Sequence, residues 1–126
     1  MDMESSSGDT NEDPLKNKGI GPIKSLTLSA IDEKLATDGE KIFATKCSAC
    51  HKFDEKVVGP PLAGVTKRRS PEWIMNMILN TNEMVEKDPI VKSMIAEYMT
   101  KMTFQDVSQQ DARAILEYFR KHDGTK

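Results

Sequence analysis

Apolar positions recur at helical spacing in several stretches of the chain, and no stretch alternates strictly between apolar and polar residues as a half-buried strand would. The first such stretch predicts a helix that begins after Thr37 or Asp38, either of which can cap it, and delivers Cys47 at its end. Gly39 lies inside this helix, where glycine costs about 1 kcal/mol relative to alanine. We therefore expect another helix to approach closely at Gly39.

Three further helices are marked by start signals. Ser70-Pro71 and Asp88-Pro89 each place a capping side chain before a proline at the first helical position. The helix after Ser70 is expected to end at 80–82, and the last helix begins at Ser108. Residues 52–70 and 99–104 are predicted loops. Four apolar residues form the inner face of the last helix, with Tyr118 beside them: Ala112, Ile115, Leu116 and Phe119. The pattern predicts an all-α domain.

Composition shifts divide the chain into four parts. Residues 1–14 are polar and acidic, which predicts a flexible tail or the remnant of a tether. Residues 15–31 mix apolar residues with glycine and proline and are expected to form an extended strap on the domain surface. Residues 32–122 form the predicted domain, and 123–126 a short C-terminal tail.

The composition narrows the class of protein. The 126 residues are 37% hydrophobic and 30% charged, which is lean for a self-sufficient core and fits a protein that buries a cofactor. The net charge of −2 gives no argument for nucleic-acid binding. No run of about 18 apolar residues predicts a membrane span. The acidic start does not resemble a signal peptide, so we expect an export signal or anchor to have been removed.

The sequence Cys47-Ser48-Ala49-Cys50-His51 carries the chemistry. Read as C-x-x-C-H, it is a c-type haem attachment site, in which two thiols add to the vinyl groups of a porphyrin and His51 is the proximal iron ligand. A redox disulfide and a zinc site are the alternatives. A redox disulfide of this spacing is typical of a βαβ unit, and no such unit is predicted here. The second needs four ligands and would have to recruit the distant His122.

With these residues, the chain from about 32 to 122 resembles the class I cytochromes c of the bacterial type. The resemblance implies four to five short helices wrapped round one covalent haem c, after an N-terminal extension. It implies that the carbonyl of Pro60, in Gly59-Pro60, accepts a hydrogen bond from His51. It also implies a methionine as sixth iron ligand, and Met102 is favoured over Met99 by its spacing to the last helix. Thr103 follows Met102 where the family usually has proline.

Two further residues acquire expected roles from the resemblance. Arg68 is placed where some members hold a haem propionate, and a guanidinium suits a carboxylate. Trp73 can donate its indole N–H to a propionate. Solvated loop positions for Arg68 and Arg69, and plain core packing for Trp73, are the alternatives.

An iron held by His51 and Met102 has no open site, so the implied function is one-electron transfer rather than enzymatic catalysis. We expect a monomeric periplasmic carrier, located in the periplasm or on the outer face of the cytoplasmic membrane, that connects a quinol-oxidising complex with a terminal oxidase or reductase. The alternatives are a domain cut from a larger oxidase or reductase subunit and a haem-based ligand sensor. Residues 46–69 carry six basic and two acidic side chains, which predicts a positive docking face.

Overall fold

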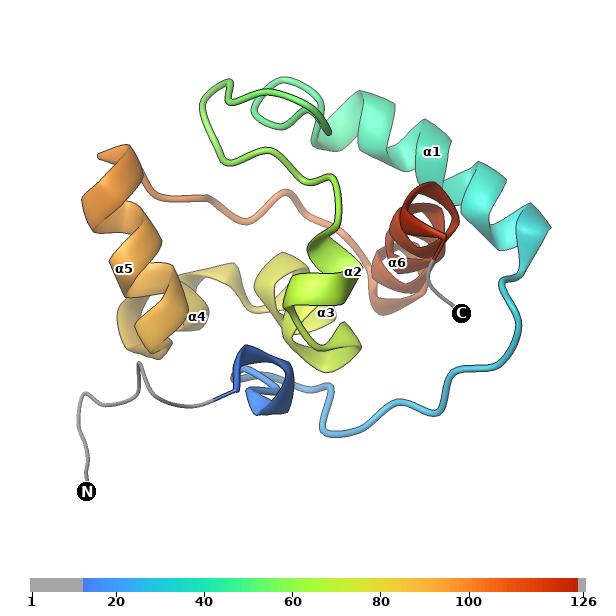
Figure 1. Ribbon diagram of the computed structural model, residues 1–126, viewed down its shortest axis with the longest axis horizontal. Coiled ribbons are helices and arrows are strands. Elements are labelled where there is room, and N and C mark those ends of the chain that lie inside the picture. The colour runs from blue at the N-terminus through green and yellow to red at the C-terminus, as the bar shows by residue number, and fades with distance from the viewer. Residues whose placement is uncertain (1–12, 125–126) are drawn as a thin grey trace.

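The computed structural model describes residues 13–124, and within that range it contains helices and connecting segments but no strand (Figure 1). The prediction of an all-α domain is confirmed, although six α-helices are present there instead of four to five. Residues 1–12 of the predicted tail lie outside the described residues. A short 3-10 helix and six α-helices follow each other along the chain: η2 (Pro14–Lys16), α1 (Glu33–Lys46), α2 (Val65–Arg68), α3 (Pro71–Leu79), α4 (Thr81–Lys87), α5 (Pro89–Tyr98) and α6 (Gln109–Asp123).

The predicted start of the first helix is wrong by more than one turn. Asp32 caps α1, and its side chain accepts a hydrogen bond from the backbone N–H of Leu35 at 3.0 Å. Thr37, which the sequence offered as a cap, lies inside the helix. Its hydroxyl donates to the carbonyl of Glu33 at 3.0 Å. A threonine that satisfies its hydroxyl in this way is tolerated in a helix interior.

Two short helices were missed. The predicted loop 52–70 contains α2, whose N-cap Gly64 has the left-handed φ of 79°. The segment after α3 was predicted as a helix end, but Asn80 terminates α3 and also precedes α4. The Thr81 hydroxyl donates back to the carbonyl of Met77 at 2.8 Å, which joins the two helices tightly. Such one-turn and two-turn helices depend on tertiary packing because nucleation is unfavourable.

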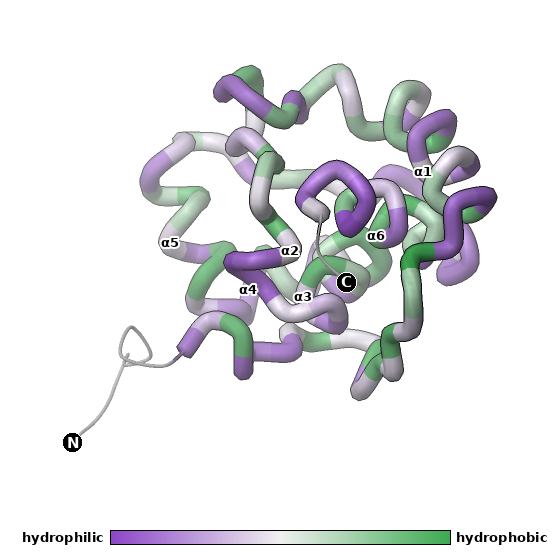
Figure 2. The backbone as a smooth tube through the Cα atoms, turned by 45° about the vertical axis from the view of Figure 1, so that its right-hand side comes forward, coloured by the Kyte–Doolittle hydropathy of each residue, from purple (hydrophilic) through white to green (hydrophobic). Residues whose placement is uncertain are grey.

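Helices α1 and α6 cross closely and form one side of the molecule (Figure 1). A Cβ atom at Gly39 would overlap the backbone carbonyl of Ala114 in α6, so the expected close approach of a second helix is confirmed. The inner face predicted for α6 is also buried. Figure 2 shows hydrophilic and hydrophobic positions alternating along α1, as expected for a helix with one face in the core.

The N-terminal segment 17–31 runs past α3 before the chain enters α1 (Figure 1). Asn76 of α3 is fully buried and bonds to this segment through both ends of its amide. Its Oδ1 accepts from Ile23 N at 3.0 Å, and its Nδ2 donates to Ile23 O at 2.9 Å and to Lys18 O at 3.0 Å. Because backbone groups of the segment are satisfied by a buried side chain, the segment is part of the packed structure. No helix among residues 13–124 is both long enough and apolar enough to span a membrane.

Candidate functional site

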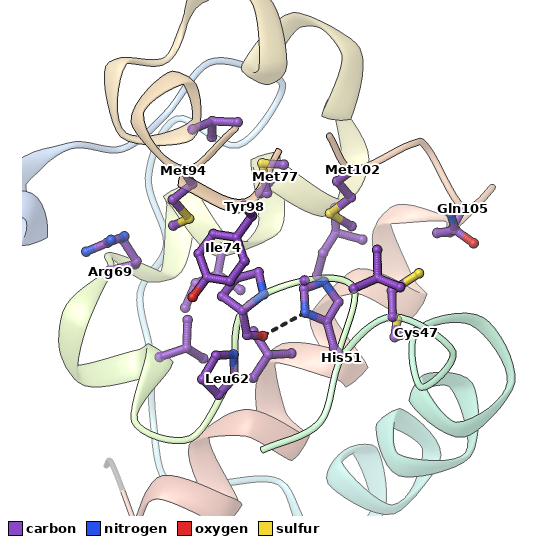
Figure 3. A pocket seen from close by; sticks show the side chains of 18 of the residues that line it. Cys47, His51, Leu62, Arg69, Ile74, Met77, Met94, Tyr98, Met102 and Gln105 are labelled. Carbon is purple, nitrogen blue, oxygen red and sulfur yellow. Dashed lines mark hydrogen bonds between the residues drawn. The ribbon is translucent and has the colours of Figure 1, made fainter. Parts of the chain in front are cut away.

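A cavity of about 470 Å³ opens between the end of α1, the loop after it, α3, α5 and the loop before α6 (Figure 3). Its volume lies in the usual range of ligand pockets, about 300–1,000 Å³. Apolar side chains from distant parts of the chain form much of its wall: Phe43, Leu62, Ile74, Ile78, Ile95 and Phe119. An apolar wall of this kind suits a hydrophobic ligand.

The end of α1 brings the cysteines and the histidine of the motif to one side of this cavity. Cys47 is the C-cap of α1, and its carbonyl accepts from Cys50 N at 3.1 Å and from His51 N at 3.0 Å. This tight turn is the reason why residues three and four positions apart face the same space. Cys47, Cys50 and His51 all line the cavity.

The ring of His51 is held in one tautomer. Its Nδ1 lies 3.0 Å from the carbonyl oxygen of Pro60, as expected from the sequence; the bond is dashed in Figure 3. A carbonyl only accepts, so Nδ1 carries the proton and Nε2 keeps its lone pair. Burial lowers the pKa of His51 below 6.5, although the bond to Pro60 opposes this shift. A neutral imidazole with a free Nε2 is the form that binds a metal.

Gly59 gives the His51 ring its room. A Cβ atom at Gly59 would lie 2.5 Å from Cε1 of the ring and 3.0 Å from Nδ1. Gly59 N also donates to Cys50 O at 2.8 Å, which fixes the loop against the motif. The sequence pointed to Gly59 only as part of a pattern, because the contact with the ring depends on how the loop folds back.

The two candidate methionines lie in different surroundings. Met99 ends α5 with a left-handed φ of 57°, and it is 85% exposed. Met102 is partly buried, lines the cavity and points into it in Figure 3. Met77 and Met94 also line the cavity from α3 and α5, and both pack against the core. Of Met99 and Met102, the fold therefore brings Met102 to the cavity and leaves Met99 in solvent.

The adjacent arginines differ as well. Arg68 also lines the cavity, but it is exposed and donates to the carbonyls of Ala63 and Pro61 in its own loop. Arg69 lines the cavity on the side away from Cys47 (Figure 3), and its Nε is buried without a hydrogen-bond partner. Burial, with repulsion from Arg68, lowers the pKa of Arg69. An orphaned cationic donor at the wall indicates a place for an anionic group of a ligand.

The role expected for the indole of Trp73 needs correction. Trp73 lines the cavity and is buried, but its Nε1–H donates to the Asp88 carboxylate at 3.1 Å instead of facing a ligand. From the sequence, Asp88 was recognised only as a helix cap. Its distance of 15 residues from Trp73 gave no signal for this bond.

The alternative chemistries find little support in the described residues. Within residues 13–124 no group of three or more His, Cys, Asp and Glu side chains is arranged to hold a metal ion. His122 stacks on Phe53 with ring centroids 3.7 Å apart. Burial and the neighbouring Cys50 raise the pKa of the Cys47 thiol to about 11. A reactive redox thiol has a lowered pKa, so Cys47 lacks that character.

These features fit a covalently attached haem. Two thiols and an imidazole with a free Nε2 lie on one side of an apolar cavity, and a methionine enters from a separate loop. In a haem, the pyrrole rings that bear the vinyl groups lie opposite those that bear the propionates. Arg69, across the cavity from Cys47, is therefore on the side suited to carboxylates.

Comparisons with known proteins agree with this assignment. Cytochrome c from Rhodothermus marinus has a similar structure, with a TM-score of 0.81 and 47% identity over 84% of this chain and 92% of that chain. The cytochrome c domain of a Pseudomonas putida protein superimposes with a TM-score of 0.61 and 27% identity, over 68% of this chain and 88% of that one. Cytochrome c-551 of Stutzerimonas stutzeri is 45% identical over 42 residues, which span 32% of this chain and 40% of that relative.

Residues 36–123 match the family described as Cytochrome c, which is well over half of the chain. Proteins of this family carry covalent haem c and have the helical fold described above. The family's members are small electron carriers. On the strength of this match, the motif and the cavity, the chain belongs to the cytochrome c family, as a member of class I.

Proposed function

We propose that this electron carrier holds its iron between His51 Nε2 and Met102 Sδ, with Cys47 and Cys50 as the covalent attachment points. The observation that carries the proposal is the bond from His51 Nδ1 to Pro60 O, because it leaves Nε2 as the free nitrogen at the cavity. The position of Met102 at the cavity, with Met99 85% exposed, supports the choice of the sixth ligand.

Haem c supplies a one-electron couple, and the protein supplies orientation, burial and charge. Pro60 and Gly59 fix the position of the His51 ring from two sides. With haem bound, the apolar wall would limit the access of water to the iron and disfavour the more highly charged oxidised state. A neutral thioether from Met102 favours the reduced state relative to a second imidazole. When the residues around the haem keep the same geometry in both oxidation states, the reorganisation energy of electron transfer is small.

We propose that Arg69, rather than the expected Arg68, binds a haem propionate. Its buried Nε lacks a partner, whereas Arg68 is turned toward Ala63 and Pro61. Trp73 contributes its ring to the wall and not its N–H.

The proposed physiological role is transfer of single electrons between a quinol-oxidising complex and a terminal oxidase or reductase in the periplasm. Covalent haem attachment takes place outside the cytoplasm, and the bacterial relatives support this location. The excess of positive charge between residues 46 and 69 supports docking on an acidic partner.

The test compares Met102→Ala with Met99→Ala in the haem-loaded protein. The ferric wild type should show the weak far-red band of iron–thioether ligation, and the reduced wild type should bind little carbon monoxide. Met102→Ala should lose the band and bind carbon monoxide, because a coordination position opens. Met99→Ala is the matched control and should behave as the wild type. Ready binding of carbon monoxide by the wild type would instead favour a ligand sensor.

A further inference from the structure

The carboxylate of Asp88 lies directly behind the cavity wall. It is 1% exposed, at the start of α5, and it contacts two residues that line the cavity. Its Oδ2 accepts from the indole Nε1 of Trp73 and from the backbone N–H of Val91, both at 3.1 Å. Asp88 is therefore a buried charge one side-chain layer away from the cofactor cavity.

Within residues 13–124, the hydrogen-bonding partners of this carboxylate are N–H donors. Besides Trp73 and Val91, the side-chain Nδ2 of Asn17 donates to Oδ1 at 2.9 Å. The two oxygens of a carboxylate, which only accept, satisfy all three of these donors. The cap bond to Val91 is local, whereas the bonds to Trp73 and Asn17 connect Asp88 with two other segments of the chain.

A cationic side chain, Arg69, lies beside this arrangement. Its guanidinium lies over the Trp73 ring, with the carbon 5.5 Å from the ring centroid. Arg69 and Asp88 interact electrostatically, and no ion pair within 4 Å joins them among the described residues. Trp73 thus lies between a buried anion and a half-buried cation, and its ring forms part of the cavity wall.

Asn17 connects the N-terminal segment to this arrangement. Its Oδ1 accepts from Gly19 N at 2.8 Å, and its backbone carbonyl accepts from the Ser70 hydroxyl at 2.8 Å. These bonds fix the direction of the Nδ2 donor toward Asp88. A residue 71 positions earlier in the chain therefore compensates part of the Asp88 charge.

We propose that Asp88 is a positioning residue that holds Trp73 against the haem and whose buried negative charge lowers the reduction potential, with Asn17 offsetting part of that charge. This inference rests on the proposed function. A negative charge near the iron favours the ferric state, because that state carries one more positive charge. Two unit charges about 10 Å apart at an effective dielectric constant of about 20 shift a one-electron equilibrium by roughly tenfold, and we expect an effect of this order.

The first experiment measures the midpoint potential of Asp88→Asn against Glu86→Gln in the haem-loaded protein. Both changes remove one negative charge, but Glu86 is exposed and its charge is screened by water. Asp88→Asn should raise the ratio of reduced to oxidised protein at a fixed solution potential by roughly tenfold, about 59 mV for one electron. Glu86→Gln should leave the ratio nearly unchanged. Equal ratios in the two variants would overturn the inference.

The second experiment uses Asn17. Asn17→Ala removes a donor and should move the potential downward, opposite to Asp88→Asn, because the carboxylate charge is less compensated. In Asp88→Asn, the NH2 group of the new side chain can face the NH2 group of Asn17, so that two donors oppose each other. The double variant, Asp88→Asn with Asn17→Ala, removes this opposition. The double variant should keep the upward shift of Asp88→Asn. An upward shift or no shift from Asn17→Ala alone contradicts the proposed role, even if Asp88→Asn fails to fold.

Spectra of the wild type distinguish a failure of the role proposed for Asp88 from a failure of the proposed function. If the wild type shows iron–thioether ligation and reversible one-electron cycling while the Asp88 and Asn17 variants leave its potential unchanged, only the role of Asp88 is refuted. If the wild type lacks that ligation, the proposed function itself fails. A merely structural role of Asp88 predicts lower stability without the opposed shifts in potential.

Discussion

The single bond between His51 Nδ1 and Pro60 O determines which ring nitrogen is available to a metal. Sequence alone placed His51 next to the second cysteine and suggested a carbonyl partner. The structure adds Gly59, whose missing side chain gives the ring its space. The His51 ring is therefore oriented by two backbone features of a loop and not by a polar side chain.

Replacing Gly59 by alanine should displace the His51 ring, because the new Cβ would lie 2.5 Å from Cε1. We expect a loss of about 1–3 kcal/mol in the free energy of unfolding, as for overpacking in a core. The far-red ferric band should weaken at the same time. Thermal unfolding and absorption spectra of the holoprotein measure both effects.

Gly124→Ala serves as the control for this change. Nothing lies within 4 Å of a Cβ at Gly124, although its φ of 68° makes alanine strained there. It should therefore lower stability and leave the absorption spectrum unaltered. An unaltered spectrum and unaltered stability in Gly59→Ala would refute the role given to Gly59.

Arg68 and Arg69 are adjacent in the chain and differ in exposure, so they provide a matched pair of variants. Arg69→Gln should lower the midpoint potential by about 60 mV if the equilibrium changes tenfold, because a half-buried positive charge near the iron is removed. Arg68→Gln removes the same charge from an exposed side chain and should have a small effect. Redox titration of both variants checks this, and a larger shift in Arg68→Gln would return the propionate to Arg68.

Among the elements, α2 and α6 are joined by a carboxylate at the end of the chain. The Asp123 side chain is 1% exposed and accepts from Gly64 N at 2.7 Å, from Thr66 N at 3.0 Å and from the Thr66 hydroxyl at 2.7 Å. These bonds satisfy the first turn of α2, a helix of only four residues. A helix this short exists because α6 supplies its cap, which explains why the sequence pattern did not predict it.

The same carboxylate predicts a pH dependence. Burial would raise the pKa of Asp123, but hydrogen bonds from Thr66 and Gly64 outweigh burial and hold it below 3.8. As the pH falls, the Asp123 carboxylate is therefore protonated at a higher pH in the unfolded chain than in the folded protein. The stabilisation is present above 3.8 and is lost as the pH falls through the folded-state pKa.

Asp123→Asn should remove this contribution. Measured by denaturant unfolding from about pH 5 to about pH 3, its stability should fall less steeply than that of the wild type. Glu86→Gln, a change at an exposed carboxylate, should retain the wild-type slope. Parallel slopes in Asp123→Asn and the wild type would show that Asp123 titrates normally.

At the scale of the whole molecule, charge is distributed unevenly. The chain carries a net charge of −2, whereas residues 46–69, which include the attachment motif, carry six basic and two acidic side chains. Lys46 lines the cavity and Lys56 lies 4.9 Å from the centroid of the Tyr98 ring, so part of this charge surrounds the cofactor opening. Such an asymmetry would steer the proposed acidic partner toward that opening.

Electron transfer to an acidic redox partner should therefore slow as ionic strength rises, because screening shortens the reach of the field. The second-order rate constant, measured by stopped flow at increasing salt, should fall steadily. Lys52→Gln, an exposed change within the positive region, should lower the rate at low salt and have less effect at high salt. A rate constant independent of salt would remove the docking face from the proposal.

The sequence by itself determined the class of fold, the attachment motif and the helices with strong caps. Ser70, Asp88 and Ser108 each accept from a backbone N–H three residues later, as their positions predicted. These features are local, since caps, proline positions and the C-x-x-C-H spacing involve residues within one or two turns of each other.

Only the tertiary structure decided the surroundings of the site. The bonds from Trp73 and Asn17 to Asp88, the orphaned Nε of Arg69 and the exposure of Met99 all depend on contacts between distant segments. Helices α2 and α4 are likewise too short to be stable without their neighbours. The energy of such contacts depends on which surfaces meet, and spacing along the chain does not encode this directly.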